Sequence, residues 1–145
     1  MESEITLQIN LIKPTPGVTF GLQKGSGRNY ETVQKQISKS GDLSFTFKVK
    51  VKENQSRDTP PKFSGSFIQG PVANRFIYID IGTYAGQSNS TWSRRLKIPL
   101  TGISWEDIDM LSDNSILRTS VPGTGKDGGP NCATVKPFEG WHILH

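Results

Sequence analysis

The sequence has one cysteine and no long apolar run, and both features exclude classes of protein. Cys132 has no second cysteine to pair with, so an internal disulfide is excluded. No stretch approaches the roughly 18 apolar residues that a membrane-spanning helix needs. The N-terminus, MESEITLQIN, is acidic and has no apolar signal core. We therefore expect a cytoplasmic protein with no membrane partner.

Motifs that mark common active sites are also missing. The sequence has no Gly-x-Ser-x-Gly elbow, no His-Glu-x-x-His pair and no Gly-x-Gly-x-x-Gly turn. Cys132, His142 and His145 supply neither a base-activated thiol nor three or four metal ligands at a workable spacing. We expect no metal and no cofactor, with Cys132 packed as a small apolar side chain.

The composition indicates one domain over residues 1–145, built from many short elements. Hydrophobic residues make up 33% and charged residues 21%, with 15 glycines and 9 prolines to punctuate the chain. The net charge of +4 permits an anionic partner without requiring one. Six basic residues form a stripe without interleaved aromatic residues, so nucleic acid is not the favoured partner. They are Lys48, Lys50, Lys52, Arg94, Arg95 and Lys97.

Alternation of apolar and polar residues is the dominant pattern, and it predicts strands. In DLSFTFKVKVK every second residue from Leu43 to Val51 is apolar, with polar residues between. Similar segments are ITLQINL, VTFGLQ, YETVQKQI, FSGSFIQ, RFIYIDIG, SRRLKIPL, ILRTSV and CATVKPF. About nine alternating strands predict an all-β, mainly antiparallel β-sandwich, with a flattened barrel as the alternative.

One short helix is predicted near residues 104–112, in the segment GISWEDIDMLS. Ser104 can cap the first turn, and Asp107 stands three residues later, where a carboxylate can reach back to the cap. Ile103 and Ile108 are spaced as a hydrophobic staple around that cap. We expect this helix to cover an open end of the sheets.

The glycine-rich segment GTGKDGG raises the question of a phosphate-binding loop. A nucleotide P-loop needs glycine where this chain has Ser120, and Ser or Thr where it has Asp127. That reading is excluded, but glycine-rich backbone can still form an anion-binding nest with charge from Lys126. The alternative is a long strand connection with Asp127 at its tip.

The segment RFIYIDIGTYAGQSNSTWSRRLKIPL places aromatic and charged residues close together. Ile77, Ile79 and Ile81 share one strand face, which leaves Tyr78 and Asp80 on the other. On the second strand Arg94 shares the apolar side, where a buried guanidinium needs a carboxylate partner, and Asp80 is the candidate. Either a structural Arg–Asp pair or a ligand clamp fits these residues.

Four segments together resemble a bacterial domain-of-unknown-function family of about this length. They are GLQKGSGRNYETVQ, FIQGPVANRFIYIDIGTYAGQ, WSRRLKIPL and PGTGKDGGPNCATVKPF. The resemblance covers nearly the whole chain and implies a stand-alone, single-domain cytosolic protein. It implies no activity and no site residues.

Three functions fit the sequence. The leading hypothesis is a non-catalytic binding module for a small polar or anionic ligand, bound by Tyr78, Asp80, Tyr84, Trp92, Arg94, Lys126 and Asp127. The second is an enzyme that uses Asp80 or Asp127 as a base beside an arginine. The third is an interaction or assembly module that works through an exposed strand edge.

Overall fold

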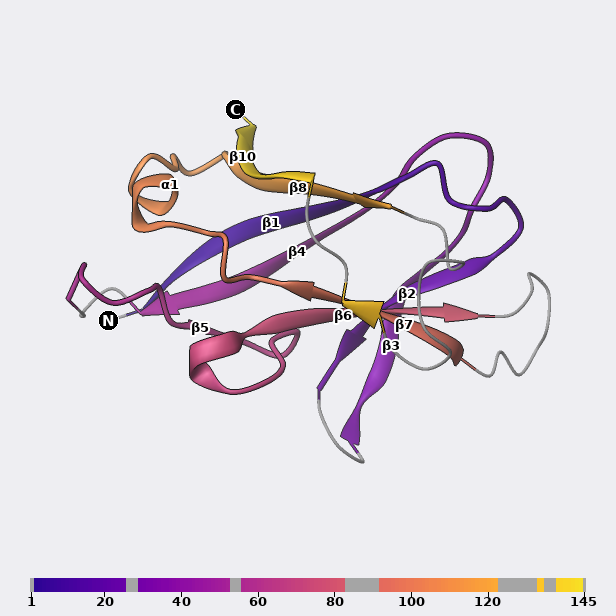
Figure 1. Cartoon of the computed structure of the whole chain (residues 1–145), viewed down its shortest axis with the longest axis horizontal. Coiled ribbons are helices and arrows are strands. Elements are labelled where there is room, and N and C mark those ends of the chain that lie inside the picture. The colour runs from indigo at the N-terminus through magenta and orange to yellow at the C-terminus, as the bar shows by residue number, and fades with distance from the viewer. Residues whose placement is uncertain are drawn as a thin grey trace.

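The chain forms two five-stranded sheets in the computed structural model, which describes residues 2–25, 29–52, 56–82, 92–122, 133–134 and 138–144 (Figure 1). Sheet A has the order β10-β8-β1-β4-β5, with β1 Glu2–Ile12, β4 Leu43–Lys52, β5 Phe63–Ser64, β8 Ile116–Pro122 and β10 Phe138–Leu144. Sheet B has the order β3-β2-β6-β7-β9, with β2 Thr19–Lys24, β3 Glu31–Ile37, β6 Phe76–Gly82, β7 Trp92–Pro99 and β9 Ala133–Thr134.

Neighbouring strands are antiparallel except at two places, where β1 pairs with β8 and β7 pairs with β9. The predicted all-β, mainly antiparallel sandwich is therefore confirmed. Across the described residues the two sheets do not join into one closed sheet, so the flattened-barrel alternative is not adopted.

The strand predictions fail where the alternation is broken. FSGSFIQ forms only the two-residue strand β5, because the chain turns at Gly65, which has a φ of +134°. Strand β10 is missing from the prediction. Its register with β8 shifts between Phe138 and His142, and Gly140 has a φ of +75°, so no period of two runs through its sequence.

The core lies between the sheets and is built by the predicted alternation. On sheet A, Leu7 of β1 stands opposite Phe47 of β4, and Ile9 stands opposite Phe45. Burying each such side chain contributes roughly 1.5–3 kcal/mol. Sheet B faces them with Phe20, Leu22, Ile77, Ile79, Ile81, Leu96 and Ile98.

The helix α1 (Trp105–Asp109) lies in the segment that crosses from sheet B to sheet A, between β7 and β8. Ser104 caps it as predicted: the Ser104 Oγ accepts from the Asp107 N–H at 3.2 Å, and the Asp107 carboxylate completes a capping box. Trp105 and Ile108 are buried in the core cluster, so the helix closes the sandwich here. No helix among the described residues is long and apolar enough to cross a membrane.

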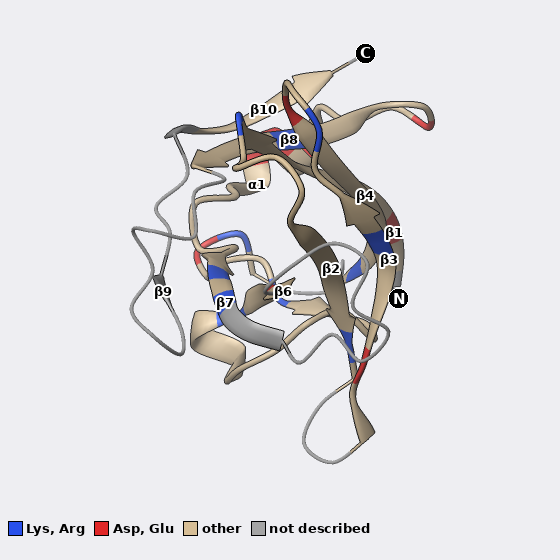
Figure 2. Ribbon diagram, turned by 90° about the vertical axis from the view of Figure 1, so that its right-hand side faces the viewer, with Lys and Arg blue, Asp and Glu red and all other residues tan. Residues whose placement is uncertain are grey.

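Two glutamines of β3 join the two sheets along one flank, where β3 and β4 run side by side (Figure 2). The Gln34 amide donates to the Thr46 carbonyl at 3.1 Å, and the Gln36 amide donates to the Ser44 carbonyl at 2.9 Å. Gln34 has a φ of +53°, at the point where the pairing of β3 with β2 shifts register. This bulge turns both amides towards β4.

The lysines of β4 are exposed, as expected for a solvated face. Lys48, Lys50 and Lys52 alternate with buried residues, and Lys48 pairs with Glu4 at 3.6 Å. Strand β5 pairs with β4 only at Lys50 and Val51, so the rest of that side of β4 is not paired with another described strand.

Candidate functional site

The outer face of sheet B carries the aromatic and charged residues that the sequence singled out. Ile77, Ile79 and Ile81 of β6 point into the core, and the alternation leaves Tyr78 and Asp80 on the opposite face. The predicted assignment of faces on β6 is thus confirmed. Around Tyr78 and Asp80 lies a group we call the arginine–tyrosine cluster, which consists of Tyr30, Thr32, Tyr78, Asp80 and Arg95.

Asp80 is fully buried, and both of its oxygens are hydrogen bonded. The Arg95 Nε donates to Oδ1 at 2.8 Å, and the Thr32 Oγ1 donates to Oδ2 at 3.0 Å. Strand register creates this arrangement, since Arg95 of β7 stands directly opposite Asp80. A buried carboxylate needs hydrogen-bond partners, and here a guanidinium and a hydroxyl satisfy one oxygen each.

Arg95 is held by Asp80 at one atom and by aromatic rings at its face. Its guanidinium carbon lies 4.6 Å from the ring centre of Tyr78 and 5.7 Å from that of Tyr30. Burial disfavours the charged guanidinium, but the hydrogen bond and the charge of Asp80 outweigh it, so the pKa of Arg95 lies above its ordinary value. The described residues provide no hydrogen-bond acceptor to its two terminal nitrogens.

Further residues extend this face on either side of the cluster. The Lys97 Nζ lies 4.2 Å from the ring centre of Phe76, which in turn packs on Tyr78 at 4.9 Å. Gln23 of β2 stands opposite Thr32 and is 3% exposed, and its Oε1 has no partner among the described residues. This face thus carries an aspartate paired with an arginine, two cationic side chains (Arg95 and Lys97) and a buried amide oxygen without a described partner.

The arginine partner of Asp80 is Arg95, which corrects the prediction of Arg94. In the β6–β7 pairing Arg94 stands opposite Ile81, a core residue, and Trp92 stands opposite Gly82. Only the backbone of Trp92 and Arg94 is described, and the side chains of both lie outside the description. The remaining predicted residues, Tyr84, Lys126 and Asp127, lie outside the described residues.

One signal in the sequence could have identified Arg95. The isoleucines of β6 place Asp80 on the outer face, and the leucine and isoleucine of β7 place Arg95 and Lys97 on the same side. Taken together, the two alternations place Asp80 and Arg95 on the same face of the sheet. Tyr30 and Thr32 could not be found in this way, because the strand order β3-β2-β6 brings Thr32 to Asp80 and Tyr30 to Arg95.

The geometry of the cluster suits recognition of an anion better than proton transfer. A guanidinium fixed at Nε presents its terminal N–H groups as a planar fork, which matches the two oxygens of a carboxylate or phosphate. Asp80 has no exposed surface, and both of its oxygens are engaged. As a general base it would have to reach a substrate within hydrogen-bonding distance, which this arrangement prevents.

Comparison with known proteins identifies a family and no activity. The model of the family of unknown function DUF5990 matches residues 5–144, which is nearly the whole chain, so the chain belongs to that family. No curated protein and no solved structure matches it.

Proposed function

We propose that this member of DUF5990 is a non-catalytic binding module, and that its ligand is a small anion received by Arg95. The supporting observation is the state of the Arg95 side chain. Asp80 fixes the guanidinium through Nε and two tyrosine rings flank its faces, while the described residues leave its terminal nitrogens without acceptors. Such preorganisation lowers the entropy cost of binding an oxyanion.

The ligand that fits best is an anion with a flat apolar part. Tyr30 is 46% exposed and Tyr78 is partly buried, so both rings can contact a ligand that lies beside the guanidinium. Tyr84, Trp92, Arg94, Lys126 and Asp127 remain proposed contributors to the same site. They would add stacking and charge if the start of β7 and the segments that carry the other three residues present their side chains on this face of sheet B.

Benzoate is a suitable probe, because it joins a carboxylate to a flat ring, and benzamide is its neutral counterpart. We expect benzoate to shift the backbone NMR signals of β6 and β7 around Asp80 and Arg95, and benzamide to leave them in place. Arg95→Lys keeps the charge but loses the planar fork, so benzoate affinity should fall about tenfold. Arg57→Lys is the matched control, since Arg57 also lies over an aromatic ring, 3.8 Å from the centre of Trp105, and also pairs with an aspartate.

Three results would each refute this proposal, and two of them concern where benzoate binds. One is the absence of benzoate-dependent shifts on β6 and β7. The other is an equal loss of affinity in Arg95→Lys and Arg57→Lys, which would mean that the effect does not arise at the cluster. Binding of benzamide as tight as that of benzoate would likewise remove the role of the anion.

The two other functions are less well supported. An enzyme that uses Asp80 as a base would need the carboxylate to leave both Arg95 and Thr32. Asp127 lies outside the described residues and remains a prediction. For a strand-edge module, the flank of β4 is a poor template, since two of its carbonyls already accept from Gln34 and Gln36.

A further inference from the structure

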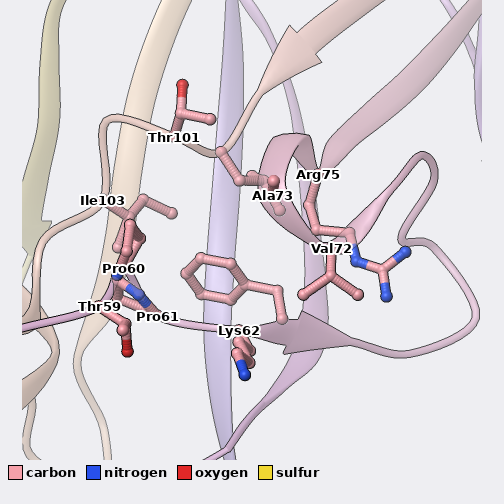
Figure 3. A pocket seen from close by; sticks show the side chains of 11 residues that line it. Thr59, Pro60, Pro61, Lys62, Val72, Ala73, Arg75, Thr101 and Ile103 are labelled. Carbon is pink, nitrogen blue, oxygen red and sulfur yellow. The ribbon is translucent and has the colours of Figure 1, made fainter. Parts of the chain in front are cut away.

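A cavity of about 350 Å³ opens at one end of the sandwich, and no residue of the arginine–tyrosine cluster lines it. Three segments that are distant in the sequence form its walls. They are residues 59–63 leading into β5, the 3₁₀ turn η2 (Val72–Asn74) with Arg75, and residues 100–103 after β7 (Figure 3). The volume lies in the lower part of the range for pockets that hold small molecules.

The walls of this cavity are mainly apolar. Phe63, Leu100 and Ile103 belong to the buried core cluster and form its inner part. Pro60, Pro61, Val72 and Ala73 line its outer part, and Val72 is 51% exposed. A cavity whose apolar wall runs from the core to the surface can bury a hydrocarbon group that enters from solvent.

Hydrogen bonds to backbone carbonyls fix each of the three walls. The Trp105 Nε1 donates to the Thr59 carbonyl at 2.7 Å, and the Lys52 N–H donates to the Lys62 carbonyl at 3.1 Å. The Leu100 N–H donates to the Arg75 carbonyl at 3.0 Å, which joins the second wall to the third. The cavity is therefore preformed, and a ligand would not have to order it.

The charges around the cavity all have one sign. Lys62 and Arg75 line it, and the described lining contains no acidic residue. Neither side chain forms an ion pair within the described part of the chain, and the Arg75 Nε is buried without a hydrogen-bond partner there. Figure 3 shows the nitrogens of Lys62 and Arg75 outside the group of apolar side chains.

From this combination we infer a second binding site, for an amphipathic carboxylate with a linear apolar chain. The chain would occupy the space between Phe63, Ile103 and Val72, and the carboxylate would remain at the mouth near Lys62. This chemistry differs from that proposed for the arginine–tyrosine cluster in its demand for a long apolar part. The two sites share no lining residue, so either can fail without the other.

The test uses hexanoate, octanoate and decanoate as probes, with octylammonium and octanol as head-group controls, all below their micelle concentrations. We expect affinity to rise about fourfold for each added methylene until the cavity is full. We expect octanoate to bind at least about tenfold more tightly than octylammonium, because Lys62 and Arg75 repel a cation. Backbone NMR shifts should map to residues 59–63, 72–75 and 100–103, which separates this site from the cluster on β6 and β7.

Two pairs of variants make the test specific to the cavity. Ala73→Phe places a ring in the space that the chain would fill, and Asn74→Phe introduces the same ring in the same 3₁₀ turn at a residue that does not line the cavity. Lys62→Glu reverses a lining charge, and Lys52→Glu makes the same change at an exposed residue of β4 that does not line the cavity. Near-ultraviolet circular dichroism would verify that each variant is folded.

The inference predicts a clear division among these variants. Octanoate binding should be lost in Ala73→Phe and kept in Asn74→Phe, and Lys62→Glu should reverse the preference between octanoate and octylammonium while Lys52→Glu should not. Equal effects within either pair would overturn the inference. It would also be overturned by octanoate shifts confined to residues outside the three walls, or by affinity that does not depend on chain length.

Discussion

The pair of Asp80 and Arg95 gives the sharpest prediction, because its two members are buried to different extents. Asp80 has no exposed surface, whereas the Arg95 side chain is 29% exposed. Substituting Arg95→Gln leaves a buried carboxylate with Thr32 as its remaining described donor. Substituting Asp80→Asn removes that buried charge and leaves a guanidinium that water can reach.

The expected losses of stability follow from this asymmetry. Removing one partner of a buried ion pair costs about 3–5 kcal/mol, and the retained Thr32 hydrogen bond and partial exposure of Arg95 reduce this to about 2–4 kcal/mol for Arg95→Gln. Asp80→Asn keeps an oxygen that can accept from Arg95 or Thr32, so it should cost about 1–2 kcal/mol. The double variant should cost less than the sum of the single variants, by at least about 1 kcal/mol.

Urea unfolding followed by circular dichroism measures these differences at neutral pH. The exposed pair of Lys48 and Glu4 provides the reference, and Lys48→Gln should change the free energy of unfolding by less than about 1 kcal/mol. The reasoning is refuted if Asp80→Asn costs more than Arg95→Gln, or if the two losses are additive. The first outcome would mean that burial does not set the order of the two losses, and the second that the two side chains do not form one coupled pair.

Three further predictions concern elements outside the cluster. Ser104→Ala should lower the free energy of unfolding by about 1 kcal/mol in urea titrations, because the capping hydroxyl is lost, and an unchanged midpoint would contradict the cap. Gly70→Ala should lower the free energy of unfolding by about 2–3 kcal/mol, because at a φ of +86° the added methyl group would collide with the Phe76 ring. Gly41→Ala is the control: Gly41 has a φ of +101° but open space around it, so the loss should be only about 1–2 kcal/mol, and equal losses would exclude the collision. Hydrogen bonds from a backbone N–H and from Asn10 lower the pKa of Asp42, so the ionised carboxylate stabilises the fold above the ordinary pKa of 3.8, and this stabilisation is lost as the pH falls through the lower folded-state pKa. The difference in unfolding free energy between the wild type and Asp42→Asn should therefore shrink over that pH range, and a constant difference would refute the linkage.

The sheets could be predicted from sequence because alternation reports burial directly. In β4 and β6 every second residue enters the core, and the observed strands match the expected ones closely. The helix was equally clear, since Ser104 and Asp107 form the capping box through contacts that are local in the sequence. Strand β10 was missed because Gly140 and a register shift interrupt its pattern.

The candidate site could be predicted only in part, because its residues come together through long-range pairing. Alternation put Tyr78 and Asp80 on one face, but the partner of Asp80 depends on how β7 is aligned with β6, and that alignment selects Arg95. Thr32 reaches Asp80 through the order of three strands. The cavity near Lys62 likewise arises from three segments that no local pattern connects.

The glutamines that bridge β3 and β4 have a consequence for how partners can be recognised. A peptide that sought to extend sheet A along this flank would have to displace Gln34 and Gln36 from the carbonyls of Thr46 and Ser44. Those amides are tethered beside their acceptors, so they compete at an effective concentration that a free peptide does not reach. Along this flank, selectivity must therefore come from side chains, because the backbone template is already in use.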